Sequence, residues 1–104
     1  MKTLGLIGHP VSHSKSPQIF AEKFKLSGRS DLDYKLFDLD KISDFITLTQ
    51  NDPSIVALNV TVPYKKAIIP FLDELSEEAR EIGAVNTIVK VEGRWIGHNT
   101  DAWG

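Results

Sequence analysis

The stretch LGLIGHPVSHSKSP, residues 4–17, decides the fold class. Its first half is a short apolar run, Leu4 to Gly8, which predicts a buried strand. Its second half ends in Ser16 and Pro17, an N-cap residue followed by proline at the first helical position. A helix is therefore expected over Pro17 to Ser27, with Gly28 just past its end. A strand that passes through a polar loop into a helix is the first unit of an α/β domain.

The rest of the chain continues this alternation. The further expected elements are a strand at Asp33 to Leu39, a helix at Lys41 to Gln50, a strand at Ile55 to Val60, short helices at Lys65 to Leu72 and Glu77 to Ile82, and strands at Ala84 to Val91 and Arg94 to Asn99. The last two strands flank Glu92-Gly93, which predicts a two-residue hairpin turn in which Asn86 lies opposite Asn99. The predicted fold is a three-layer α/β domain: a mostly parallel twisted sheet, helices on both faces, and a carboxy-terminal β-hairpin that adds one antiparallel strand.

Composition narrows the function classes. The chain has 104 residues, 41% of them apolar, and a formal net charge of −2, so a single domain with its own core is expected. A membrane partner is not expected, because no apolar run approaches the ~20 residues of a membrane span. No signal peptide is recognised at the start, so we expect a cytoplasmic protein. The balanced charge argues against nucleic acid as a partner. The chain has no cysteine, and its three histidines lack His-x-x-x-His spacing, so no metal site is predicted.

The first polar cluster is HSKSP, residues 13–17, in the loop after the first strand. The hydroxyls of Ser14 and Ser16 precede a helix whose free N–H groups and positive dipole end favour an anion, and a carboxylate would suit them. The alternative is that Ser16 is only an N-cap and Ser14 only a loop residue.

The second cluster follows the third strand. Asn59, Thr61 and Lys65 together supply donors and acceptors able to hold a polyhydroxylated ring. The alternative is a strand-end asparagine followed by an exposed lysine. Because the carboxyl ends of parallel strands meet at one edge of a sheet, this cluster and the first are expected to lie close together.

The third cluster combines Asn86 with the Asn-Thr-Asp that ends at Asp101. A lysine and an aspartate that share a polar cleft can exchange protons with a hydroxyl or ketone, the carboxylate stabilising the charged lysine. Lys65 and Asp101 are the candidates for that pair. The alternative is that Asp101 is the N-cap of a following helix.

These motifs, taken in order, resemble the amino-terminal domain of shikimate dehydrogenases along the whole chain. They are Gly8-His9-Pro10, residues 13–17, residues 59–63 (NVTVP) with Lys65, residues 83–87 (GAVNT), and residues 99–101 (NTD) with Gly104. The resemblance implies an enzyme of aromatic amino acid biosynthesis that reduces 3-dehydroshikimate to shikimate with NADPH. The chain departs from the usual family pattern at Phe20-Ala21 and at Ala57.

Carried onto this sequence, the resemblance implies a role for each motif residue. Ser14 and Ser16 look like ligands of the substrate carboxylate, and Asn59, Thr61 and Asn86 look like ligands of ring oxygens. Lys65 and Asp101 look like the catalytic pair, which also contacts the substrate. Glu77 looks like an acidic residue near the cofactor. Residues 1–104 would form the substrate-binding domain. The nucleotide-binding domain is absent from this chain, which also lacks a Gly-x-Gly-x-x-Gly motif.

We therefore expect NADP to bind only in a longer enzyme and the isolated chain to be inactive. Three alternatives stay open. The domain could belong to a quinate/shikimate dehydrogenase, it could be a non-catalytic binding module for a hydroxylated carboxylic acid, or it could be an interaction domain that forms a homodimer through an exposed sheet edge.

Overall fold

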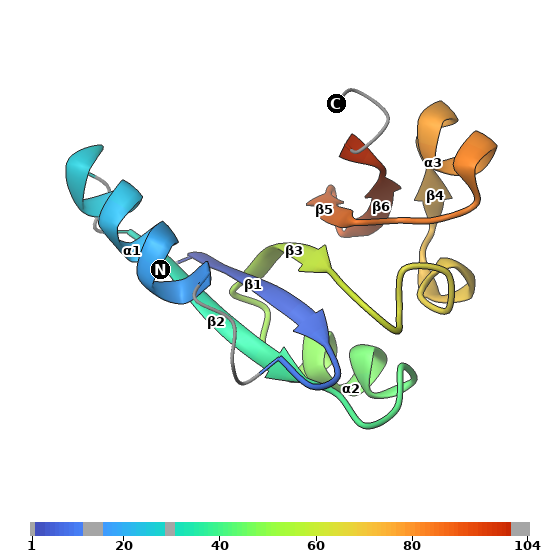
Figure 1. Ribbon diagram of the computed structural model, residues 1–104, viewed down its shortest axis with the longest axis horizontal. Coiled ribbons are helices and arrows are strands. Elements are labelled where there is room, and N and C mark those ends of the chain that lie inside the picture. The colour runs from blue at the N-terminus through green and yellow to red at the C-terminus, as the bar shows by residue number, and fades with distance from the viewer. Residues whose placement is uncertain (1, 12–15, 29–30, 101–104) are drawn as a thin grey trace.

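The computed structural model describes residues 2–11, 16–28 and 31–100, with the backbone alone for residues 16 and 17. Its elements, in chain order, are β1 (Lys2–Gly8), α1 (Ser16–Leu26), β2 (Leu32–Asp38), α2 (Asp44–Asn51), β3 (Ile55–Val60), the 3-10 helix η1 (Ile69–Phe71), β4 (Glu74–Leu75), α3 (Glu77–Ile82), β5 (Thr87–Val91) and β6 (Arg94–His98) (Figure 1). No helix in these described stretches is long and apolar enough to cross a membrane.

The strands form one mixed sheet in the order β2-β1-β3-β5-β6-β4. β1 pairs in parallel with β2 and β3, β4 pairs in parallel with β6, and β5 is antiparallel to both of its neighbours. Within this sheet β5 therefore runs against the common direction. The predicted fold class is confirmed, including the hairpin that contributes one antiparallel strand.

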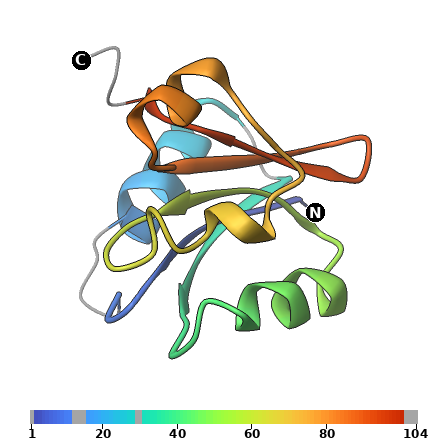
Figure 2. The same cartoon turned by 90° about the vertical axis from the view of Figure 1, so that its right-hand side faces the viewer.

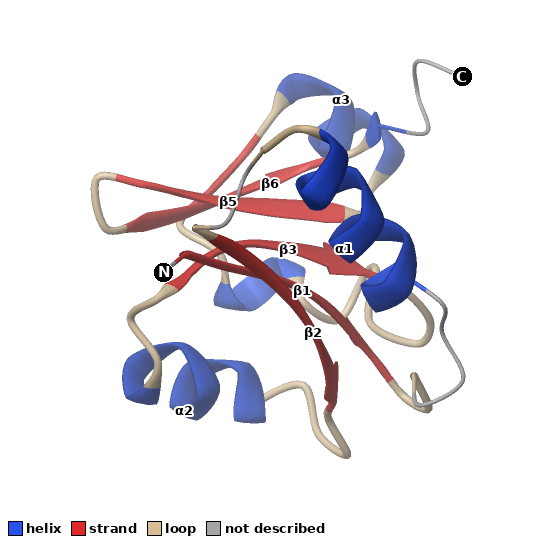
Figure 3. Cartoon of the chain, turned by 90° about the vertical axis from the view of Figure 1, so that its left-hand side faces the viewer, coloured by secondary structure: helices blue, strands red, loops and turns tan. Residues whose placement is uncertain are grey.

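Helices cover both faces of the sheet (Figures 2 and 3). α1 lies on one face, where the ring of Phe20 stacks on Tyr34 of β2 with 4.4 Å between centroids. On the other face Phe45 of α2 meets Trp95 of β6 edge to face, with 5.6 Å between centroids. The main core lies on this second face, and its largest fully buried side chains are Phe45, Ile7, Ile55, Leu58, Ile68, Ile88 and Val85.

The hairpin has the predicted register. Val91 pairs with Arg94 and Thr87 with His98. Both turn residues have positive φ, 51° at Glu92 and 78° at Gly93, as the tight two-residue turns that match strand twist require. Glutamate is an unusual occupant of such a conformation, and the pairing of the flanking strands holds it there.

Several predicted element bounds were wrong. The helix expected from Lys41 begins only at Asp44, and the one expected over Lys65 to Leu72 is reduced to η1. The strand expected from Ala84 begins at Thr87. The backbone N–H of Val85 donates to the carbonyl of Lys65 at 2.7 Å instead of to a neighbouring strand. β4 was not predicted at all.

Candidate functional site

Three chain segments that carry predicted site residues meet at one edge of the sheet. The N–H of Val60, at the end of β3, donates to the carbonyl of Asn86 at 2.8 Å. The N–H of Asn86 in turn donates to the carbonyl of His98, at the end of β6, at 3.0 Å. The Val85 bond to Lys65 adds a third link. Backbone hydrogen bonds therefore fix the position of the second polar cluster relative to Asn86 of the third.

Asn86 uses its side chain to hold the turn after β6. Its Oδ1 accepts from the backbone N–H of Thr100 at 3.0 Å, and its Nδ2 donates to Thr100 Oγ1 at 3.0 Å. Asn99, which the sequence placed opposite Asn86, is buried, and its Nδ2 donates to the carbonyl of Ala84 at 3.1 Å. The partner of the Asn86 amide is thus Thr100, one residue further on than the strand register indicated.

Asn59 lies on the face of the sheet that α1 covers. Its Oδ1 accepts from the Tyr34 hydroxyl at 3.1 Å, and its Nδ2 lies 3.5 Å from Thr87 Oγ1. A largely apolar cavity of about 210 Å³ adjoins it, and Phe20, Tyr34 and Thr87 are among the lining residues. The ring of Phe20 lines this cavity and stacks on Tyr34.

Thr61 and Lys65 lie in the turn that follows β3, and both are half-buried. The N–H of Thr61 donates to the carbonyl of Ile7 at 2.9 Å, and its carbonyl accepts from Tyr64 at 3.0 Å. These bonds attach the turn to the end of β1. No described residue pairs with the Thr61 hydroxyl, so this group can serve a ligand.

The remaining predicted site residues are Ser14, Ser16, Glu77 and Asp101. Ser14 and Asp101 lie outside the described residues, as does the side chain of Ser16, so the carboxylate site and the Lys65 to Asp101 pairing stay predictions. Glu77 is exposed in the first turn of α3. In the part of the chain that the structure describes, no hydrogen bond or ion pair joins it to the Asn59 and Asn86 amides.

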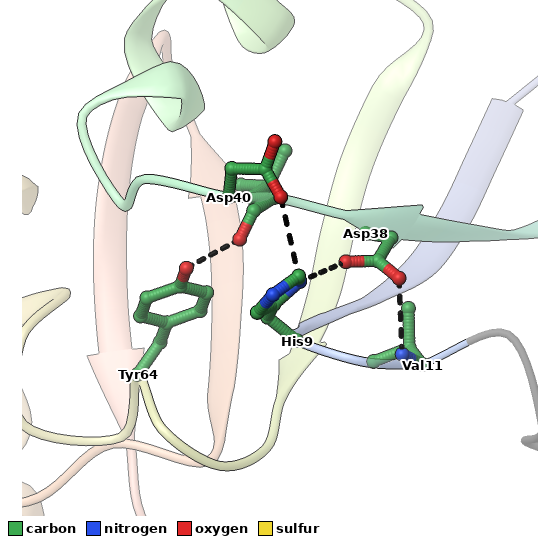
Figure 4. Close-up of polar contacts among 6 residues, drawn as sticks. His9, Val11, Asp38, Asp40 and Tyr64 are labelled. Carbon is green, nitrogen blue, oxygen red and sulfur yellow. Dashed lines mark hydrogen bonds and ion pairs between the residues drawn. The ribbon is translucent and has the colours of Figure 1, made fainter.

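A second polar network, missed by the sequence analysis, lies at the ends of β1 and β2 (Figure 4). His9 Nδ1 is 2.5 Å from Asp38 Oδ1 and 3.7 Å from Asp40 Oδ1. The hydrogen bond with Asp38 raises the pKa of His9, and the same bond lowers the pKa of Asp38. The sequence held part of this signal, because His9 and Asp38 stand at the ends of two predicted strands. The structure adds that these strands are adjacent and parallel, with Gly8 paired to Asp38.

The ligand-capable atoms of His9, Asp38 and Asp40 lie within 4.8 Å of one another, and all three residues are exposed. His9 Nδ1 and Asp38 Oδ1 lie within hydrogen-bond distance, and the raised pKa of His9 favours the protonated, positively charged ring beside the carboxylate. We therefore interpret the group as an ion pair.

This network also holds the turn that carries Lys65. The backbone N–H of His9 donates to the carbonyl of Val62 at 3.2 Å. The buried hydroxyl of Tyr64 donates to the carbonyl of Leu39 (Figure 4). Burial raises the pKa of Tyr64, and the neighbouring Asp40 carboxylate raises it further, so the phenol keeps the proton that it donates. The backbone next to Lys65 is therefore attached to two other strand ends.

Amides and hydroxyls gathered at the carboxyl ends of the strands of such a sheet are typical of α/β domains that bind small polar ligands. Residues 6–88 match the family model described as the shikimate dehydrogenase substrate binding domain. The chain belongs to this family.

Comparisons with individual relatives support the same family. The shikimate dehydrogenase (NADP(+)) of Pyrococcus abyssi is 47% identical over 104 residues, which are 100% of this chain and 39% of the relative. The crystal structure of shikimate dehydrogenase 1 from Peptoclostridium difficile superposes with a TM-score of 0.90 and 42% identity, covering 99% of this chain and 39% of that one. A Thermus thermophilus shikimate 5-dehydrogenase in complex with NADP(H) and shikimate superposes with a TM-score of 0.86 and 38% identity, covering 98% and 39%. The chain thus spans about two fifths of the length of these relatives.

Proposed function

We propose that this chain is the substrate-binding half of a shikimate dehydrogenase, which holds 3-dehydroshikimate or shikimate during reduction and oxidation. The observation that carries the proposal is the pair of amides, Asn59 and Asn86, linked side by side at the sheet edge in a domain of this family. The solved complex of the Thermus thermophilus relative with NADP(H) and shikimate supports the ligand class. We assign the reaction to the cytoplasm, in the route to aromatic amino acids.

The proposed binding roles divide the ligand between its carboxylate and its ring. Ser14 and Ser16 bind the carboxylate at the start of α1, where helix N–H groups favour an anion. Asn59, Thr61 and Asn86 bind oxygens of the ring. A ring that carries several hydroxyls suits a site in which most polar groups are uncharged amides and hydroxyls.

Lys65 and Asp101 are assigned the proton transfer. Reduction of a ketone to an alcohol needs a hydride at carbon and a proton at oxygen, and Lys65 would deliver the proton from its ammonium group. In the oxidising direction it would receive the proton back. Asp101, as a neighbouring carboxylate, would favour the charged lysine and orient it.

NADP is the proposed cofactor, and it supplies the hydride when it is bound in the longer enzyme. This chain has no Gly-x-Gly-x-x-Gly motif for a dinucleotide. We therefore assign the cofactor to a second domain, with Glu77 of this chain near it, and expect residues 1–104 alone to be catalytically silent.

Binding is tested by an NMR titration of the chain with shikimate. The backbone amides of Thr61, Lys65 and Asn86 should shift together and saturate, with an affinity on the order of millimolar because half of the cleft is missing. Lys65→Ala should weaken the response. Lys66→Ala, which removes the neighbouring exposed lysine, is the matched control and should leave it unchanged. A folded chain in which none of these amides moves would contradict the proposal.

Turnover is tested in a chimera in which residues 1–104 replace the corresponding segment of the Pyrococcus abyssi enzyme. The chimera should oxidise shikimate with NADP, Lys65→Ala should abolish most of this rate, and Lys66→Ala should preserve it. A comparison of shikimate with quinate decides between the two dehydrogenase classes. Binding without turnover in the chimera would favour a non-catalytic module, and turnover by the isolated chain would show that the cofactor assignment is wrong.

A further inference from the structure

We propose that Thr87 is a positioning residue that orients the two amides of the site, so that Asn86 can offer its ligand only a hydrogen-bond donor. The inference deepens the proposed function and rests on it for the identity of the ligand. Thr87 itself needs no contact with the substrate.

The first step is the place of Thr87 between the two amides. Thr87 is the first residue of β5 and pairs with Asn59 of β3. Its Oγ1 lies 3.5 Å from Asn59 Nδ2 and donates to Asn86 Oδ1 at 3.1 Å. A threonine hydroxyl has a single proton. Because that proton goes to Asn86, the same oxygen can only accept from Asn59, and the direction of both bonds is fixed.

The second step follows the Asn86 amide. Its Oδ1 accepts from the Thr87 hydroxyl and from the backbone N–H of Thr100, which together occupy both lone pairs. Its Nδ2 gives one proton to Thr100 Oγ1. One N–H remains, and no described residue receives it. A flipped amide would place its NH₂ group against the Thr100 N–H, donor against donor, so the backbone itself opposes the alternative orientation.

The third step concerns Asn59, whose side-chain amide is oriented by the hydroxyl of Tyr34. Tyr34 donates its hydroxyl proton to Oδ1 at 3.1 Å, and Nδ2 faces Thr87. This amide also keeps one N–H without a partner among the described residues. Both amides therefore retain a donor, and the ligand oxygens next to them act as acceptors, as a ketone must and a hydroxyl can.

The test begins in the ligand-free chain with the side-chain NH₂ signals of Asn59 and Asn86, observed by ¹⁵N NMR. Thr87→Val keeps the shape and removes the hydroxyl, and it should shift both pairs of signals. Thr87→Ser restores the hydroxyl and should restore both. Thr49→Val is the matched control, because the Thr49 hydroxyl bonds the carbonyl of Phe45 within α2, and it should leave both pairs unchanged.

The second readout is affinity for shikimate. Thr87→Val should weaken binding about three- to tenfold, the range expected when one net hydrogen bond is lost, while Thr87→Ser should stay within about twofold of the unsubstituted chain. Unchanged NH₂ signals in Thr87→Val would overturn the positioning role. Shifted signals with unchanged affinity would overturn its importance for the ligand. Signals that respond in a chain with no affinity for shikimate would support the positioning and refute the proposed function instead.

Discussion

Replacing Gly8 with alanine should displace Thr61 without abolishing β1. A Cβ atom at Gly8 would lie 2.5 Å from Thr61 Cγ2, 2.6 Å from Val11 Cγ1 and 3.1 Å from the carbonyl oxygen of Val62. The two methyl groups can rotate or shift, but the Val62 carbonyl is part of the backbone. Overpacking of this kind costs about 1–3 kcal/mol. For a domain of this size the melting temperature should therefore fall by roughly 5–20 °C.

The same substitution should weaken ligand binding, because Thr61 is one of the residues assigned to the ring oxygens. Displacing its hydroxyl removes about one net hydrogen bond, which corresponds to a loss of affinity of roughly two- to tenfold. Urea unfolding followed by circular dichroism measures the loss of stability. A shikimate titration followed at the Thr61 and Lys65 amides measures the loss of affinity.

Gly5→Ala separates a local effect on the site from a general loss of stability. Gly5 lies in the same strand, and its added methyl would meet β2, with Phe37 Cε2 at 2.5 Å and the carbonyl of Lys35 at 2.8 Å. We expect a comparable loss of stability and an affinity within about twofold of the unsubstituted chain. The reasoning is refuted if Gly8→Ala binds shikimate normally, or if both variants lose affinity equally while folded.

Three further predictions concern stability. Ser76→Ala should cost about 1 kcal/mol in urea unfolding, because its hydroxyl caps α3, whereas Ser43→Ala should cost less because Ser43 makes no side-chain cap bond; equal losses would contradict this. Phe45→Ala should cost about 3–5 kcal/mol in the same assay, since it empties the largest fully buried position, and a loss below 1 kcal/mol would argue against this core. The ion pair should stabilise the fold most between pH 3.8 and 6.5, because the pKa of Asp38 is lowered from 3.8 and that of His9 raised from 6.5. Thermal scans of His9→Ala should therefore show its deficit shrinking as pH rises through the raised His9 pKa or falls through the lowered Asp38 pKa, and a pH-independent deficit would refute the pairing.

The elements that sequence alone predicted well are those specified by their own residues. β3 and α3 have the predicted bounds, α3 because Ser76 caps its start and Gly83, at φ 76°, ends it. The hairpin register followed from the two residues of its turn. In each case the signal and the structure that it predicts lie within a few positions of each other.

β4 shows why other elements could not be predicted from the sequence. Only Glu74 and Leu75 form it, and no periodicity marks two residues as a strand. What creates it lies across the sheet: Asp73 accepts from the backbone N–H of Trp95 at 2.7 Å, and the N–H of Asp73 donates to the Trp95 carbonyl at 2.9 Å. Those bonds pair the chain before β4 with β6. The two partners are too far apart in the sequence for a local pattern to predict their contact.

The candidate site likewise has a part that the sequence predicts and a part that it does not. Residue types and strand ends were sufficient to place Asn59 and Asn86 at one edge, because the carboxyl ends of strands and the antiparallel register determine where backbone atoms lie. They were insufficient to identify Thr87, whose role depends on which proton each side chain donates. That information emerges only when every donor around the two amides has been assigned.

The two kinds of bond at this edge should also respond differently to mutation. Backbone bonds such as Val60 to Asn86 and Val85 to Lys65 hold the segments together, and they do not involve the side chain of residue 87. The side-chain bonds through Thr87 act together with the Thr100 N–H and the Tyr34 hydroxyl to orient the amides. Half-buried groups of this kind contribute little net stability, because water can replace the lost partner. Loss of core packing at Phe45 should therefore lower stability with normal affinity in the folded fraction, whereas loss of the Thr87 hydroxyl should lower affinity at nearly normal stability. In a site whose positions come from the sheet, and whose donor pattern comes from the Thr87 and Tyr34 hydroxyls and the Thr100 N–H, loss of one hydroxyl can change what is recognised without changing how the chain folds.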